Sequence, residues 1–102
     1  MGFEWEKIFD INEPPEYLYY VNGDEFKEYT MKNGLVSNGG HLSMMRADID
    51  ETIQIGAATW DRPIIYTVHS GAMYRQGSIF YKSKNGVWLT ERVPVEYLTW
   101  RA

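Results

Sequence analysis

The sequence predicts a small α+β domain, and three observations support that prediction. At 102 residues the chain is long enough for one hydrophobic core and too short for two. Hydrophobic residues make up 44% of it and aromatic residues 16%, which is typical of a folded chain. Short β-prone runs alternate with amphipathic segments and end in a hairpin, an order that is typical of α+β architecture. No linker or internal repeat divides the chain, so we expect one domain over residues 1–102.

The beginning of the chain has no regular period and ends at Pro14-Pro15, which disfavours a helix and favours an extended entry. We therefore expect residues 1–15 to form an N-terminal arm, residues 16–98 the core and residues 99–102 a tail. The arm is acidic and aromatic, and we expect it to cover apolar surface, to contact a partner or to mediate a homodimer.

The first half of the core predicts a strand, a helix and a second strand. Residues 17–21 are aromatic and β-branched, which favours a strand. Residues 22–24 mark a turn and a helix start, and Asn33-Gly34 marks the helix end. The side chains expected on the buried side of this helix are Phe26, Tyr29 and Met31. Residues 35–40 are expected to form a loop, and residues 41–43 begin a short strand.

The second half predicts another helix, a central strand and a short helix. Asp48, with a Glu three residues later, has the spacing of a capping box at a helix start. The side chains expected on the buried side of that helix are Ile49, Ile53, Gly56, Ala57 and Trp60. Residues 61–63 break the helix, and residues 64–68 are the most β-prone run of the chain. Residues 70–76 indicate a turn of helix that Gly77 ends.

A β-hairpin is predicted towards the end of the chain. Residues 79–81 and 87–89 are rich in β-branched and aromatic residues, and Asn85-Gly86 between them readily supplies positive φ at a tight turn. We expect Trp88 to be buried and Pro94 to end the run.

Charge and histidine spacing limit the classes of site. The net charge is −4, with eight acidic and two basic residues in residues 1–30 but six basic and two acidic residues in residues 62–102. Six bases spread over that length are typical of solvated surface. Cysteine is absent, and neither His41 nor His69 has the spacing of a metal ligand set, so we expect no metal site. Phosphate-cradling loops and nucleophile elbows are also missing, and no catalytic residue can be named.

No apolar run approaches the length that spans a membrane, and the acidic N-terminus does not have the pattern of a signal peptide. We expect a soluble, cytoplasmic protein without a membrane partner.

Residues 80–98 read F-Y-x-S-x-N-G-V-W-L-T-x-x-V-P-x-x-Y-L, which resembles the closing signature of the RNA 2′-phosphotransferase family. Proteins of that family remove the 2′-phosphate left on spliced RNA by transferring it to NAD. They have a winged-helix-like first lobe and a second lobe with an ADP-ribosyltransferase fold that holds NAD. The resemblance covers residues 18–98 and implies the second lobe only, with the first lobe missing.

The resemblance also implies cofactor-binding positions. Three strand positions shape the NAD cleft of that fold: a His in L-Y-H-G-T, a His in H-L-S and an apolar residue in N-G-V-W-L-T. The matching positions, together with the serine of H-L-S, are Tyr20, His41, Ser43 and Val87. Tyr20 replaces the family's His, and the Arg before H-L-S and a basic segment after the second helix are also missing. By itself, a lone His in a half-buried strand, such as His41, is more typical of a hydrogen-bonded structural residue.

The missing site residues favour a non-catalytic binding or interaction module on an ADP-ribosyltransferase-like fold, for example an inhibitor or accessory protein of viral or mobile-element origin. One alternative is an NAD-dependent enzyme, either RNA 2′-phosphotransferase-like or another ADP-ribosyltransferase. A second alternative is a protein that sequesters an NAD-derived nucleotide. The expected partner is a protein, with an NAD-derived nucleotide or RNA as alternatives, and the expected state is a monomer or a homodimer.

Overall fold

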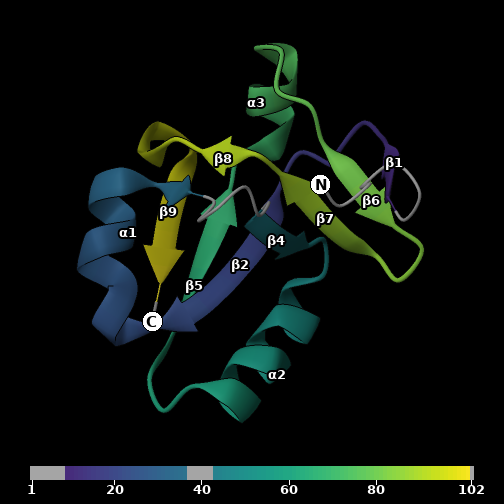
Figure 1. Ribbon diagram of the computed structural model, residues 1–102. Helices are drawn as coiled ribbons and strands as arrows, with labels where there is room; N and C mark the ends of the chain where they lie inside the picture. The colour runs from purple at the N-terminus through teal and green to yellow at the C-terminus, as the bar shows by residue number, and fades with distance from the viewer. Residues whose placement is uncertain (1–8, 37–42, 102) are drawn as a thin grey trace, which may run out of the picture.

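The computed structural model describes residues 9–36 and 43–101, and these form an antiparallel sheet with helices around it (Figure 1). The strands are β1 (Phe9–Ile11), β2 (Leu18–Gly23), β3 (Leu35–Val36), β4 (Ser43–Arg46), β5 (Pro63–Val68), β6 (Tyr81–Ser83), β7 (Val87–Thr90), β8 (Arg92–Val93) and β9 (Leu98–Arg101). The helices are α1 (Lys27–Asn33), α2 (Ile49–Thr59) and α3 (Ser70–Arg75), with 3₁₀ turns at Asp24–Phe26 and Val95–Tyr97. Over the described residues, seven strands form one sheet in the order β1-β6-β7-β4-β2-β5-β9, and β3 pairs with β8 in a second. The predicted α+β architecture is confirmed.

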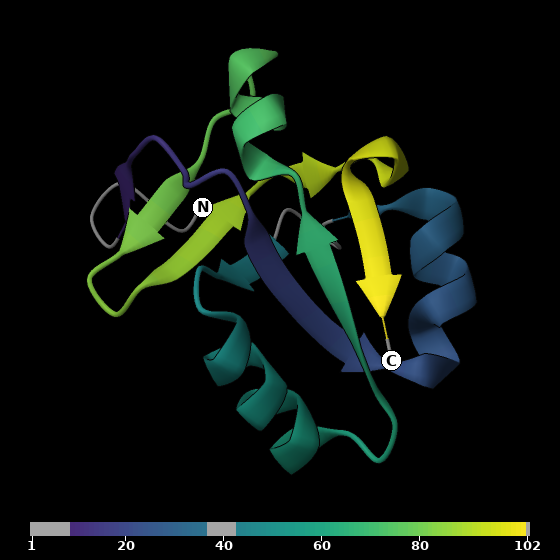
Figure 2. The same cartoon turned by 180° about the vertical axis from the view of Figure 1, so that it is seen from behind.

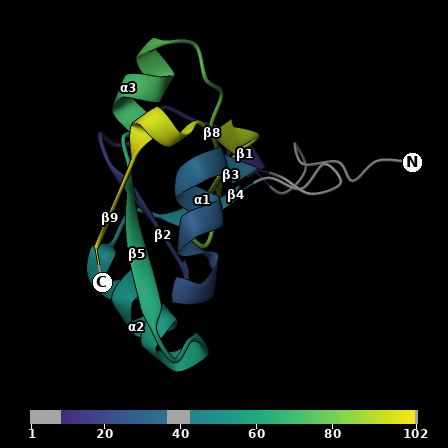
Figure 3. The ribbon, with the colours of Figure 1, turned by 90° about the vertical axis from the view of Figure 1, so that its left-hand side faces the viewer.

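Helices α1 and α2 pack against opposite sides of the sheet. Successive side chains of β2 alternate in direction, so neighbouring residues of this strand contact different helices. On one side, Asn22 Nδ2 donates a hydrogen bond of 3.2 Å to Thr30 Oγ1 of α1. On the other side, a Cβ atom at Gly56 of α2 would lie 2.7 Å from Val21 Cγ2, so α2 approaches β2 closely only because Gly56 has no side chain. Figure 3 shows α1 standing beside the sheet, and Figure 2 shows β2, β5 and β9 side by side.

The main hydrophobic core lies on the α1 side of the sheet, where the second sheet also packs. Its buried members are Leu18, Leu35, Met45, Ile64, Tyr66, Val68, Met73, Phe80, Trp88, Val93 and Leu98. Trp88 is 5% exposed, so its predicted burial is confirmed. Strand β5, which its sequence predicted to be central, lies between β2 and the edge strand β9, so it is an interior strand but not the middle of the sheet.

Helix α1 ends as predicted but buries a different side. Gly34 follows the helix with φ +77°, which is favourable for a glycine. Phe26 and Tyr29, both expected to be buried, are 45% and 59% exposed, while Thr30 is buried and Met31 packs against the core. The prediction failed because Phe26 belongs to the preceding 3₁₀ turn, and because Thr30, with its partner on β2, is the residue that faces the sheet.

Helix α2 begins as predicted, and its buried side is also shifted. Asp48 Oδ1 accepts hydrogen bonds from the backbone N–H groups of Asp50 (2.9 Å) and Glu51 (3.2 Å), which confirms the cap. Thr52 and Gly56 are buried, whereas Ile53 and Ala57 are exposed. Burial of Thr52 costs little because its hydroxyl donates to the carbonyl oxygen of the capping residue at 2.9 Å.

The predicted hairpin forms between β6 and β7, with a different turn. Gly86 has φ +83°, but no other residue of the turn has positive φ, so this is not the two-residue turn that needs two such residues. The N–H of Gly86 donates to the Ser83 carbonyl oxygen (3.1 Å), and the N–H of Val87 donates to Ser83 Oγ (3.1 Å). The side chain of Ser83 thus stabilises a longer turn.

Three segments have more regular structure than predicted. Residues 9–11 of the expected arm form β1, which pairs with β6, and residues 35–36 of the expected loop form β3. Residues 99–101 of the expected tail belong to β9, which pairs with β5. These strands are two to four residues long, too short for a period of two to be recognisable in the sequence. None of the helices in the described part of the chain is long and apolar enough to span a membrane.

Candidate functional site

The strands that carry the expected cofactor-binding positions are neighbours in the sheet. Strand β4 pairs with β7, so that Ser43 lies opposite Thr90 and Arg46 opposite Val87. On its other edge β4 pairs with β2, where Tyr19 lies opposite Arg46. His41 falls outside the described residues, and only the backbone position of Ser43 is described. Segments distant in the sequence therefore lie side by side.

Two of the expected site side chains point to opposite sides of the sheet. Val87 is in register with Arg46, and Arg46 with Tyr19, so these three side chains share the α2 side. Tyr20 is the next residue and points to the α1 side. The structure therefore does not bring the side chains of Tyr20 and Val87 together, and their role in cofactor binding stays a prediction.

Arg46 is a residue of this region that the sequence analysis missed. Arg46 lies between Val87 and Tyr19 in the register of the three strands, and its Nη1 is 3.7 Å from Glu51 Oε2 of α2. Both side chains of this ion pair are partly exposed, so the pair is weak. The signal in the sequence is that Arg46 lies three residues after the serine of H-L-S, whereas the family's Arg is expected before that motif.

The surroundings of Tyr20 are polar and buried. Tyr20 lies opposite Tyr66 in the β2–β5 register, with ring centroids 6.1 Å apart. Burial raises the pKa of both phenols, and Asn22 offsets part of the rise at Tyr20. Both phenols are therefore neutral at physiological pH. In the described part of the chain, Asn22 Oδ1 and the Tyr66 hydroxyl are buried without a hydrogen-bond partner.

This polar cluster was only partly predictable. Tyr20 was named from the family resemblance, but Asn22 was assigned to a turn and Tyr66 to an apolar strand. The available signal was the i, i+2 spacing of Tyr20 and Asn22, which places both side chains on one side of a strand.

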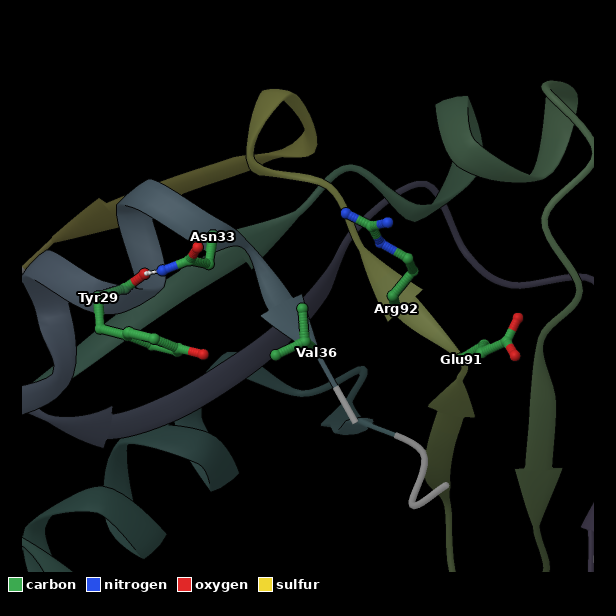
Figure 4. A pocket seen from close by; sticks show the side chains of 5 residues that line it. All are labelled: Tyr29, Asn33, Val36, Glu91 and Arg92. Atoms are coloured by element: carbon green, nitrogen blue, oxygen red, sulfur yellow. Dashed lines mark hydrogen bonds between the residues drawn. The ribbon is translucent and has the colours of Figure 1, made fainter. Parts of the chain in front are cut away.

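A pocket of about 520 Å³ lies between α1 and the second sheet (Figure 4). The residues that line it are Tyr29, Asn33, Val36, Glu91 and Arg92. Val36 and Arg92 are opposite each other in the β3–β8 register and are both exposed. The sequence analysis missed this pocket because Glu91 and Arg92 occupy the two unspecified positions between L-T and V-P of the closing signature.

Acidic side chains do not form a metal centre in residues 9–36 and 43–101, where no three His, Cys, Asp or Glu residues are placed to hold an ion. Asp48 is occupied as the cap of α2, as its sequence position predicted.

No protein-family model matches the chain. Three similar proteins are each named "Probable RNA 2'-phosphotransferase". The protein from Nostoc punctiforme is 39% identical over 85 residues, which are 83% of this chain and 46% of that protein. The protein from Flavobacterium johnsoniae is 39% identical over 90 residues, which are 88% of this chain and 49% of that protein. The protein from Escherichia coli O45:K1 is 36% identical over 87 residues, which are 85% of this chain and 44% of that protein. The chain spans about half the length of these relatives. The predicted resemblance is thus confirmed: most of this chain is related in sequence to the RNA 2′-phosphotransferase family.

Proposed function

We propose that this chain provides the NAD-binding part of an NAD-dependent, RNA 2′-phosphotransferase-like activity. The observation that carries the proposal is the 36–39% identity, over 83–88% of the chain, to proteins named for that activity. This similarity supports the transferase alternative better than the non-catalytic interaction module that the missing site residues favoured. No comparison supports an inhibitor, a viral origin or a protein partner.

The arrangement of β2, β4 and β7 supports the proposal. The three motif-bearing segments are adjacent, as they must be if they line one cleft. We assign Arg46 to an anionic group of the nucleotide, because it lies opposite Val87 and, among the described residues, its one ion pair is partly exposed and weak. Tyr20 points to the opposite side of the sheet, so this assignment does not extend to its neutral hydroxyl.

A second candidate function is the binding of an NAD-derived nucleotide without turnover. It is favoured by Tyr20 in place of the family's His and by the absence of a base in residues 56–60. Orientation of phosphate groups normally depends on bidentate Arg contacts, so their loss is expected to affect turnover more than binding.

Two measurements on the full chain separate these functions. The first is NAD-dependent loss of phosphate from a 2′-phosphorylated RNA oligonucleotide, and the second is NAD affinity by calorimetry. Phosphate loss establishes the transferase, and NAD binding without it establishes the second candidate. If the chain neither binds NAD nor removes phosphate, both functions are wrong.

A pair of variants tests the assignment of Arg46. Arg46→Gln is expected to weaken NAD binding about tenfold, the usual effect of losing a hydrogen bond to a charged group. Arg62→Gln is the matched control, since Arg62 also forms an exposed ion pair, with Asp24 at 3.9 Å. Equal affinities of the two variants would refute the assignment.

A further inference from the structure

The pocket between α1 and the second sheet has walls held in place by buried neighbours. Leu35 and Val93 are opposite each other in the β3–β8 register and are 5% and 0% exposed, so the next pair, Val36 and Arg92, points away from the core. A Cβ atom at Gly34 would collide with the Val93 carbonyl oxygen, so this glycine allows α1 to end close against β8. The pocket is therefore formed before any ligand arrives.

The helix wall offers an aromatic ring and an amide. Tyr29 and Asn33 are four residues apart and so lie on the same face of α1. Tyr29 is 59% exposed, although a phenol ring is favourably buried. Asn33 Nδ2 donates to the Tyr29 carbonyl oxygen at 3.0 Å, which orients the amide and leaves its Oδ1 to accept a hydrogen bond.

The sheet wall offers charge. Figure 4 shows the Arg92 side chain extending from β8, while the Glu91 carboxylate points away from Tyr29. Among the five lining residues, Arg92 is the one cation and Val36 the one aliphatic residue. A single guanidinium suits one phosphate better than a run of phosphates, and one aliphatic side chain is too little for an apolar peptide.

An exposed aromatic ring, an oriented amide and a guanidinium are the groups with which proteins hold a nucleotide: the ring stacks on the base, the amide binds its edge, and the guanidinium binds phosphate. A volume of about 520 Å³ is within the range of small-molecule sites. We propose that this pocket binds one nucleotide unit, with its base stacked on Tyr29 and its phosphate at Arg92. The proposal rests on the proposed function, which supplies two sources of that unit: the RNA acceptor and the adenylate half of NAD.

The test is equilibrium binding of three probes, AMP, NAD and a five-nucleotide single-stranded RNA, to the full chain. Tyr29→Ala is expected to weaken binding at least about fivefold, since it removes the stacking platform. Tyr29→Phe keeps the ring and is expected to retain the affinity. Arg92→Gln is expected to weaken binding about tenfold at low salt and less at high salt, because salt screens an exposed guanidinium.

Matched controls lie on the same chain outside the pocket. Tyr74 on α3 is 40% exposed, and Arg101 on β9 is exposed, so Tyr74→Ala and Arg101→Ala remove the same chemical groups elsewhere. Melting temperatures confirm that each variant is folded. A loss of affinity confined to the RNA probe assigns the pocket to the RNA acceptor, and a loss of affinity for AMP and NAD assigns it to the adenylate half of NAD. Either result supports the proposal.

Two results overturn it. If the wild-type chain binds a probe and the two pocket variants bind it as tightly as the controls do, the pocket proposal is wrong and the proposed function stands. If Tyr29→Phe weakens binding as much as Tyr29→Ala, stacking is not the interaction. A wild-type chain that binds none of the three probes contradicts both the pocket proposal and the proposed function.

Discussion

Replacing Trp88 by alanine tests the packing of the α1 side of the sheet. Trp88 is 5% exposed, lies opposite the buried Met45 on β4, and has Lys82 Nζ 5.6 Å from its ring centroid. Replacing a buried aromatic residue by alanine typically costs about 3–5 kcal/mol, because both the transfer energy and a filled volume are lost. Total stabilities of small domains are about 5–15 kcal/mol, so this variant is expected to lose a large fraction of its stability.

Urea unfolding monitored by circular dichroism measures the loss. A slope of about 2 kcal/mol per molar converts the expected cost into a midpoint lower by about 2 M. Trp100→Ala is the matched control, since Trp100 is 44% exposed and Lys27 Nζ lies 3.9 Å from its ring centroid. That exposed cation–π contact is worth about 0.5–1 kcal/mol. Equal losses for the two variants would refute the assignment of Trp88 to the core.

Three further predictions concern a turn, a cap and an ion pair. Gly86→Val is expected to lower the free energy of unfolding, measured by thermal unfolding, by about 1–2 kcal/mol, because φ is +83°. The space around Gly86 is open, so the cost comes from the backbone and not from a clash. Gly86→Asn should cost less, and an equal loss of stability for the two variants would contradict a backbone cause. Asp48→Ala is expected to cost about 1 kcal/mol in urea unfolding, and unchanged stability would show that the two hydrogen bonds of this cap contribute nothing. The hydrogen bonds from Arg75 hold the pKa of Glu16 below its usual 4.5. The ion pair therefore stabilises the fold fully above about pH 4.5, and this contribution is lost as the pH falls through the lowered pKa. Arg75→Gln is expected to return the Glu16 pKa towards 4.5 in an NMR titration, and an unchanged pKa would remove Arg75 as the cause.

The elements that the sequence predicted correctly are those with a local cause. Gly34 ends α1 because the backbone there needs positive φ, and Asp48 starts α2 because its carboxylate accepts two backbone N–H groups. Strands β2 and β5 are long enough for β-branched and aromatic residues to be recognisable. Each of these causes acts within a few residues, so a single sequence is sufficient to find it.

The elements that were missed depend on distant partners. Strand β9 is only four residues long and is ordered by pairing with β5, just as β1 is ordered by pairing with β6. The buried side of α2 contains Thr52, whose hydroxyl is satisfied within the helix, so hydrophobicity alone selects the wrong residues. A period of 3.6 is also poorly defined in a helix of seven residues such as α1.

The candidate site was predictable to the extent that it follows the family signature. That signature located β4 and β7 and, with the early strand, the neighbourhood of Tyr20. It could not locate Arg46, which sits next to Val87 only through the register of β4 with β7. It also could not locate Arg92, because the signature leaves that position unspecified.

The departures from the hydrophobic pattern on α1 have a common consequence. This helix exposes Tyr29 and buries Thr30, the reverse of what hydrophobicity predicts. Natural sequences usually follow such patterns and break them mainly at functional sites. Here the exposed ring lines the pocket, while the buried hydroxyl accepts a hydrogen bond from Asn22, two residues after Tyr20. Stability alone would favour the opposite arrangement, so the sequence of α1 is better explained by the two polar sites that it contacts than by packing.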